Sequence, residues 1–167
     1  MKSRAIGLAL LMLSACVAPQ KVAPPPVPRP APPPPPPPPA PPPADWRDRP
    51  LTPGDWHYQR TGAGGEAVYG TDPATPRLAL RCARAQGQVW LVWPGAAAAS
   101  VAIQTTEISA VKTGTIVGAE LQLPFAARDP LLDQMAYSRG RIMLTAGEQA
   151  LIVPSWPEIS RVIEDCR

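Results

Sequence analysis

The sequence has little of the residue types on which catalytic and metal chemistry most often depends. It contains one histidine, His57, and three cysteines, and charged residues make up 17% of the chain. A metal site built on two or three imidazoles is therefore excluded, and no cluster of cysteines replaces them. A Ser-His-Asp arrangement would have to use His57, but no Gly-x-Ser-x-Gly elbow is present to expose a serine. We expect neither a metal ion nor any other cofactor.

In the part of the chain that can form a core, positive and negative charges nearly balance. The formal net charge of the whole sequence is +3, yet from Leu51 to Arg167 there are 10 basic and 11 acidic residues, a net charge of −1. The remaining basic residues precede Leu51. Because a basic surface that follows phosphates is absent, the sequence gives no support for a nucleic-acid partner.

Proline is the residue present in excess, and it is concentrated in one stretch. Of the 26 prolines, 18 fall between Pro19 and Pro50, and Pro32 to Pro39 are consecutive. Such a run forms a stiff, solvated polyproline II rod, and from Val17 to Ala44 it would reach roughly 80 to 90 Å. We interpret it as a disordered polyproline tether. A ligand for proline-recognition domains is the alternative interpretation.

The first residues have the anatomy of an export signal. Lys2 and Arg4 precede an apolar run, Ile6 to Leu13, that is too short to span a bilayer. The next residues, Leu13-Ser14-Ala15-Cys16, resemble the lipobox of bacterial lipoproteins. The resemblance implies cleavage before Cys16 and acylation of this cysteine, which then anchors the mature chain in a membrane without a transmembrane helix.

The resemblance to lipoproteins also implies a cellular location for the protein and a division of the chain into three parts. Val17 follows the cysteine, where an aspartate would resemble an inner-membrane retention signal. We therefore expect a lipid-anchored protein of the bacterial cell envelope, on the outer membrane and facing the periplasm. The predicted parts are a signal peptide (1–15), a lipidated cysteine with a proline-rich linker (16–50) and a globular β-rich domain (51–167).

After Pro50 the pattern changes to short alternating apolar runs separated by glycine and proline, which is typical of small antiparallel β domains. The sequence predicts nine strands: Asp55 to Arg60, Ala67 to Gly70, Arg77 to Ala83, Gln88 to Trp93, Ser100 to Thr106, Ser109 to Lys112, Thr115 to Leu123, Arg141 to Thr145 and Gln149 to Val153. The glycines from Gly62 to Gly65 resemble a phosphate-binding loop in glycine content only. No lysine or helix accompanies them, so a hairpin turn explains them.

Two stretches are predicted to be helical. Asp129-Pro130 offers an N-cap followed by proline, and Gly140 would end this first helix. Ser155 and Glu158 have the spacing of a capping box for a second helix. That helix carries one apolar stripe, formed by Ile159, Val162, Ile163 and Cys166.

The two cysteines other than Cys16 form an even pair. Cys82 shares strand parity with Leu78 and Leu80, and Cys166 lies on the apolar stripe of the last helix, so both sulfurs are expected to face one core. In an oxidising compartment such a pair forms a disulfide. The sequence thus predicts a mainly β fold with two short helices (α+β): a small antiparallel β-sandwich or barrel with a C-terminal helix docked by a disulfide.

Few residues are candidates for contact with a ligand or partner. Trp90 and Trp93 fall on opposite faces of one strand, so one of them could stack on a sugar ring or a partner protein. Arg139 and Arg141 flank a turn and could hold an anion, although a basic helix end explains them too. His57 is expected to be a solvated strand residue, Asp129 a cap and Asp133 a solvent-facing carboxylate.

The strand-rich layout ending in a cysteine resembles small periplasmic β domains with one disulfide, such as the invasion-associated locus B proteins and the membrane-bound lysozyme inhibitors. The conserved loop of the inhibitors has no counterpart here. Our first hypothesis is a non-enzymatic envelope lipoprotein whose β domain binds a periplasmic or outer-membrane partner, either peptidoglycan or an envelope protein. The alternatives are an inhibitor of a cell-wall hydrolase and, last, an envelope hydrolase.

Overall fold

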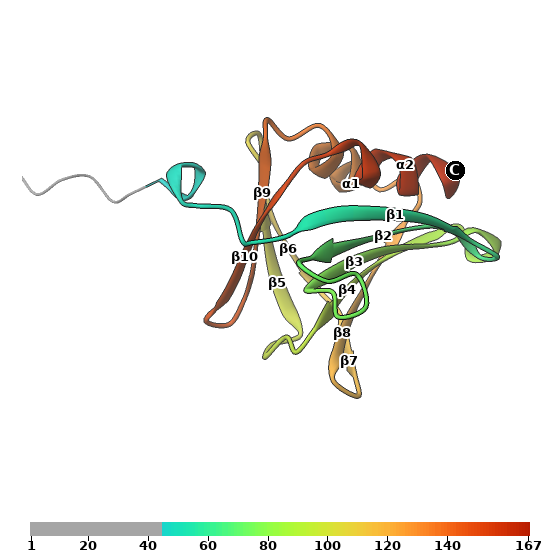
Figure 1. Ribbon diagram of the computed structural model, residues 1–167, viewed down its shortest axis with the longest axis horizontal. Coiled ribbons are helices and arrows are strands. Elements are labelled where there is room, and N and C mark those ends of the chain that lie inside the picture. The colour runs from blue at the N-terminus through green and yellow to red at the C-terminus, as the bar shows by residue number, and fades with distance from the viewer. Residues whose placement is uncertain (1–44) are drawn as a thin grey trace, which may run out of the picture. The chain divides into compact units, whose positions relative to one another are not determined.

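The computed structural model describes residues 45–167 (Figure 1). The predicted signal peptide, Cys16 and the proline-rich stretch up to residue 44 lie outside the described residues. Within residues 45–167, no helix has the length and apolar character needed to cross a membrane.

The described residues form two antiparallel sheets, two short α-helices and two 3-10 helices. The six-stranded sheet has the order β1 (Asp55–Thr61), β2 (Gly64–Gly70), β3 (Leu78–Ala83), β4 (Gln88–Pro94), β8 (Glu120–Ala126) and β7 (Thr115–Val117). The four-stranded sheet has the order β10 (Gln149–Pro154), β9 (Arg141–Ala146), β5 (Ser100–Gln104) and β6 (Ser109–Thr113). The helices are η1 (Trp46–Asp48), η2 (Arg84–Gln86), α1 (Pro130–Ala136) and α2 (Pro157–Asp165).

One apolar core joins both sheets and both helices. Alternate residues of β3 and β4 point inward, so that Leu80 and Leu91 are about 1% exposed or less, and Leu144 of the other sheet is fully buried. The helix α2 packs over β2, β3 and β1, and α1 packs against α2 (Figure 1). The predicted class is therefore confirmed: a mainly β, antiparallel fold with two helices, arranged as a sandwich whose open side the helices fill.

The disulfide between Cys82 and Cys166 is also confirmed. It joins β3 to the residue that follows α2, with 5.4 Å between the two Cα atoms. The inward face of α2, with Ile159, Val162 and Ile163, belongs to the core and packs over β1 to β3. The last helix is thus fixed both by burial of its apolar stripe and by a covalent bond.

The prediction of one strand from Thr115 to Leu123 is wrong. The chain turns at Gly118, whose φ is +62°, and the two halves pair as β7 and β8. A positive φ is readily adopted by glycine, but the branched residues before Gly118 gave the appearance of an unbroken strand.

The helix boundaries also differ from the predicted ones. Asp129 caps α1 as expected, since its carboxylate accepts a hydrogen bond from the Leu131 N–H at 2.9 Å, but α1 ends at Ala136 rather than at Gly140. The predicted capping box of α2 does not form. The Ser155 hydroxyl lies instead 2.7 Å and 2.8 Å from the carbonyl oxygens of Met135 and Ala136. It therefore satisfies the C-terminal end of α1 rather than the start of α2.

The segment from Asp45 to Gly54 lies against the four-stranded sheet. Arg47 donates a hydrogen bond to the Thr106 carbonyl, and Arg141 donates one to the Arg49 carbonyl at 2.7 Å. Farther along, the Thr52 N–H donates to the Ile152 carbonyl at 2.8 Å, and the Ile152 N–H donates to the Thr52 hydroxyl. These contacts cover part of the free edge of β10, where unpaired backbone groups would otherwise face solvent.

Candidate functional site

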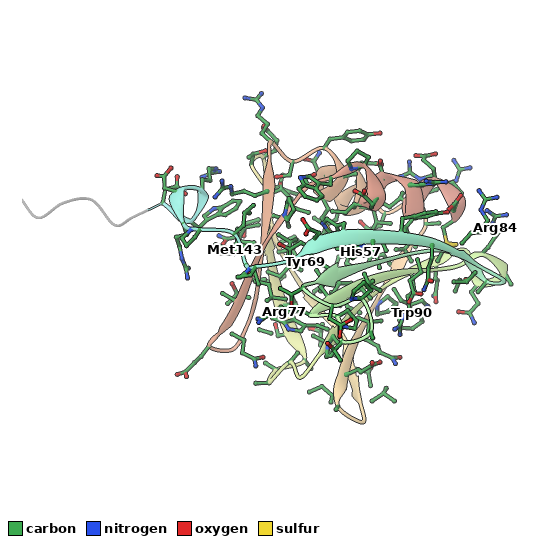
Figure 2. The ribbon with its side chains drawn as sticks, in the orientation of Figure 1. His57, Tyr69, Arg77, Arg84, Trp90 and Met143 are labelled. Atoms are coloured by element: carbon green, nitrogen blue, oxygen red, sulfur yellow. A yellow bond between two sulfur atoms is a disulfide. The ribbon has the colours of Figure 1, made fainter. Side chains whose placement is uncertain are left out.

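The tryptophans predicted as contact residues lie on opposite faces of β4, as the alternation requires. Trp93 is 4% exposed and belongs to the core, which leaves its ring little surface to offer to a partner. Trp90 is partly buried on the outer face of the six-stranded sheet, against Val68, Ala79 and Val92 (Figure 2). Of the two, Trp90 therefore stays the candidate for a contact.

The two predicted arginines lie near the link between α1 and β9. The side chain of Arg139 is 86% exposed, and its Nε lies 3.8 Å from a carboxylate oxygen of Glu107. The guanidinium of Arg141 is engaged with the Arg49 carbonyl. Because Trp90 belongs to the other sheet, the structure does not gather the predicted contact residues into one site.

The one histidine can also be placed, and the structure can be searched for a metal site. His57 is exposed on β1 and pairs in register with Val68 (Figure 2). Within residues 45–167, no three side chains of histidine, cysteine, aspartate or glutamate come together as a metal site.

A pocket of about 470 Å³ lies between the β1–β2 hairpin, η2 and the C-terminal end of α2. Much of its wall is formed by small residues of the hairpin and of the chain after β3, namely Gly62, Ala63, Gly64, Ala83 and Ala85. Its ionisable lining residues are Arg60, Arg84 and Asp165. We call it the arginine pocket. Its volume lies in the range of small-ligand sites.

Two glycines allow the hairpin to close onto the end of α2. A Cβ on Gly64, whose φ is +139°, would overlap the Cys82 sulfur, and a Cβ on Gly65 would overlap the Asp165 carboxylate. The hairpin is then fixed to η2 by a hydrogen bond from the Arg84 N–H to the Ala63 carbonyl at 3.0 Å. The glycine-rich turn expected from the sequence thus forms a wall of the pocket, directly beside the disulfide.

Asp165 contacts the two arginines that line the pocket. Its carboxylate accepts a short hydrogen bond from the Tyr58 hydroxyl and lies 3.6 Å from the Arg60 guanidinium. Its main-chain carbonyl accepts a hydrogen bond from Arg84 Nε at 2.6 Å. Arg161 stacks over the Tyr58 ring at 4.0 Å and adds a third guanidinium nearby.

The charge balance of this cluster is positive. The Tyr58 side chain, followed by the Asp165 carboxylate, raises the pKa of the Arg60 guanidinium above its ordinary value. Arg60 and Arg84 line the pocket opposite a single carboxylate, so the lining carries a net charge of +1. Figure 2 shows Arg84 at one end of the six-stranded sheet. The arrangement is suited to binding an anion.

A second cavity of about 330 Å³ lies between the β2–β3 loop, the end of β4 and the β9–β10 hairpin. Trp93 and Arg77 are among its lining residues, so Trp93 has a small surface there. Arg77 is the one charged residue in its lining. This second cavity is therefore a weaker candidate for an anion-binding site than the arginine pocket.

The arginine pocket was not predicted from the sequence, although one signal was available. A disulfide between Cys82 and Cys166 brings the neighbours of both cysteines together, and those neighbours include Arg84 and Asp165. Comparisons with protein-family models, with curated proteins and with solved structures found no match to this chain. The functional argument therefore rests on the site itself.

Proposed function

We propose that this protein is a non-enzymatic lipoprotein of the bacterial envelope that presents its β-sandwich on a proline-rich spacer and binds another envelope component through the arginine pocket. The lipobox and the proline-rich stretch support the anchor and the spacer. The pocket supports binding, because it combines a concave surface with one guanidinium, that of Arg84, which is held by a hydrogen bond before any ligand arrives.

The observation that carries the binding function is the position of Arg84. Its Nε donates a hydrogen bond to the Asp165 carbonyl, and this is the one hydrogen bond that its side chain makes within residues 45–167. A fixed guanidinium at the rim of a pocket loses little side-chain entropy on binding an anion. It is therefore a better binding group than a freely moving surface arginine.

The anchor is tested separately from the binding site. In the producing bacterium, the wild-type chain should incorporate labelled fatty acid and fractionate with the outer membrane. The Cys16→Ser variant should incorporate none. Equal labelling of the two proteins, or a wild-type chain that is released as a soluble protein, would contradict the anchor.

The binding site is tested by crosslinking in intact cells. A photo-reactive amino acid replaces Gln86, which lines the pocket, or Glu148, an exposed residue of the β9–β10 turn that serves as the matched control. We expect a discrete adduct from position 86 that disappears when Arg84 is also changed to alanine. Identical adducts from both positions, or no adduct from position 86, would contradict binding at the pocket.

The shape of the pocket favours a receptor over a hydrolase inhibitor. An inhibitor that blocks a hydrolase by filling its cleft needs a protruding surface, whereas the arginine pocket is itself concave and receives a group from outside. The purified protein in large molar excess should therefore leave lysozyme activity unchanged. Loss of lysozyme activity at near-stoichiometric amounts would instead favour the inhibitor.

A further inference from the structure

The donors of the arginine pocket define the kind of anion that it can accept. We propose, building on the binding function above, that its ligand is a carboxylate attached to a small apolar group. Such a carboxylate occurs at the C-terminus of a peptide whose last residue is small, and it also occurs in a free short-chain acid. Four features of the pocket support this assignment.

The first feature is the geometry of Arg84. A guanidinium can bind a carboxylate side-on, through Nε and one terminal nitrogen, or end-on, through both terminal nitrogens. Arg84 Nε already donates to the Asp165 carbonyl at 2.6 Å, which leaves the end-on pair. Two parallel donors in one plane match the two oxygens of a single carboxylate.

The second feature is the charge balance. Arg60, with a side chain 73% exposed, lies 3.6 Å from the Asp165 carboxylate and has room to turn toward a ligand. The lining has a net charge of +1, so a monoanion would neutralise it. A dianionic phosphate would add a negative charge close to Asp165, where like charges repel.

The third feature is the state of the backbone amides. Phosphate-binding loops depend on free main-chain N–H groups that point at the ligand. Here the Ala63 N–H donates to the Thr61 hydroxyl, the Arg84 N–H to the Ala63 carbonyl and the Gly87 N–H to the Arg84 carbonyl. Because these three amides are already engaged, they are not free to bind the oxygens of a phosphate.

The fourth feature is the wall. Alanine and glycine carbons surround the guanidinium groups, and none of the residues that line the pocket is aromatic. A nucleobase or sugar ring would find no aromatic side chain in the lining on which to stack. A methyl-sized group next to the carboxylate would contact the apolar surface of Ala63, Ala83 and Ala85.

The test compares ligands that differ in one group, bound to the full chain. Acetyl-alanyl-alanine, its C-terminal amide, propionate and inorganic phosphate are titrated, and binding is followed by NMR on the amide signals of Ala63 and Ala85. We expect saturable shifts with the free acid and none with the amide, and weaker binding of phosphate than of the acid. Tighter binding of the dipeptide than of propionate assigns the carboxylate to a peptide end, and equal binding assigns it to a free acid.

Variants locate the binding. Arg84→Gln should weaken binding of the acid about tenfold, as expected for loss of a charge-assisted bidentate contact. Arg139→Gln removes another exposed arginine, which lies outside the lining of the pocket, and should change nothing. Equal binding of acid and amide, tighter binding of phosphate, or unchanged binding by the Arg84→Gln variant would overturn the carboxylate assignment. If the crosslink at position 86 persists while the acid does not bind, the proposed binding function stands and the ligand class alone is wrong.

Discussion

The disulfide between Cys82 and Cys166 should supply a large share of the stability of the domain. It closes a loop with a sequence separation of 84 residues. In the chain-entropy model, a loop of this length removes about 15 cal/mol/K from the unfolded chain, which corresponds to about 4.6 kcal/mol at room temperature. Domains of this size have a total free energy of unfolding of about 5 to 15 kcal/mol. Reduction should therefore bring the domain close to its limit of stability.

The cleanest comparison uses one polypeptide in two redox states. Urea unfolding of the full chain is followed by tryptophan fluorescence, with and without excess dithiothreitol. For an m-value of about 1.5 to 2 kcal/mol per M, reduction should lower the urea midpoint by roughly 2 to 3 M. The sequence and the packing volume of the sulfurs are almost unchanged, so the difference reports the crosslink rather than a cavity.

A double variant serves as the control. The Cys82→Ala, Cys166→Ala protein should unfold near the midpoint of the reduced wild type and should not respond to dithiothreitol. Cleavage of the bond is verified by counting free thiols. A reduced wild type that loses less than about 1 kcal/mol would refute the reasoning, because the unfolded chain would then gain little freedom from the missing crosslink.

Three further substitutions test individual contacts. Asp129 is partly buried, which raises its pKa, but hydrogen bonds from Lys112 and from a backbone N–H outweigh this effect and hold the pKa below its ordinary value of 3.8. Its contribution to stability is therefore complete above about pH 5 and is lost as the pH falls further. Acid unfolding curves of Asp129→Asn should be less steep than those of the wild type, and identical curves would contradict this role. Ser155→Ala should lower the free energy of unfolding by about 1 to 2 kcal/mol in urea titrations, because it leaves the carbonyls at the end of α1 without their hydroxyl partner; no change would show that water replaces it. Gly65→Ala places a methyl group against a carboxylate and should lower the thermal midpoint, whereas Gly62→Ala, with open space around it, should not; equal midpoints would mean that the hairpin shifts without cost.

The sequence was informative wherever burial follows a simple period. Alternating apolar residues in β3 and β4 predicted both strands and the inward direction of Cys82, and the stripe on α2 predicted the direction of Cys166. Because both side chains were predicted to point into the same core, the disulfide between them could be predicted as well. In both cases the pattern depends only on residues that are close in the chain.

The sequence was uninformative where a residue finds a distant partner. Ser155 has the spacing of a cap, yet its hydroxyl contacts the end of α1, because the two helices lie side by side. The arginine pocket combines Arg60, Arg84 and Asp165 from three elements, and no short motif contains all of them. Such a site follows from sequence only after the disulfide has been placed.

The order of contacts along the N-terminal segment has a mechanical consequence. Tension on the chain before Asp45 reaches the hydrogen bond of Arg47, then that of the Arg49 carbonyl, then the two that join Thr52 to Ile152. This segment should therefore detach from its sheet step by step. The covalent loop from Cys82 to Cys166 cannot lengthen under the same load. Under tension the N-terminal end of the domain would therefore unravel before the part that the disulfide encloses.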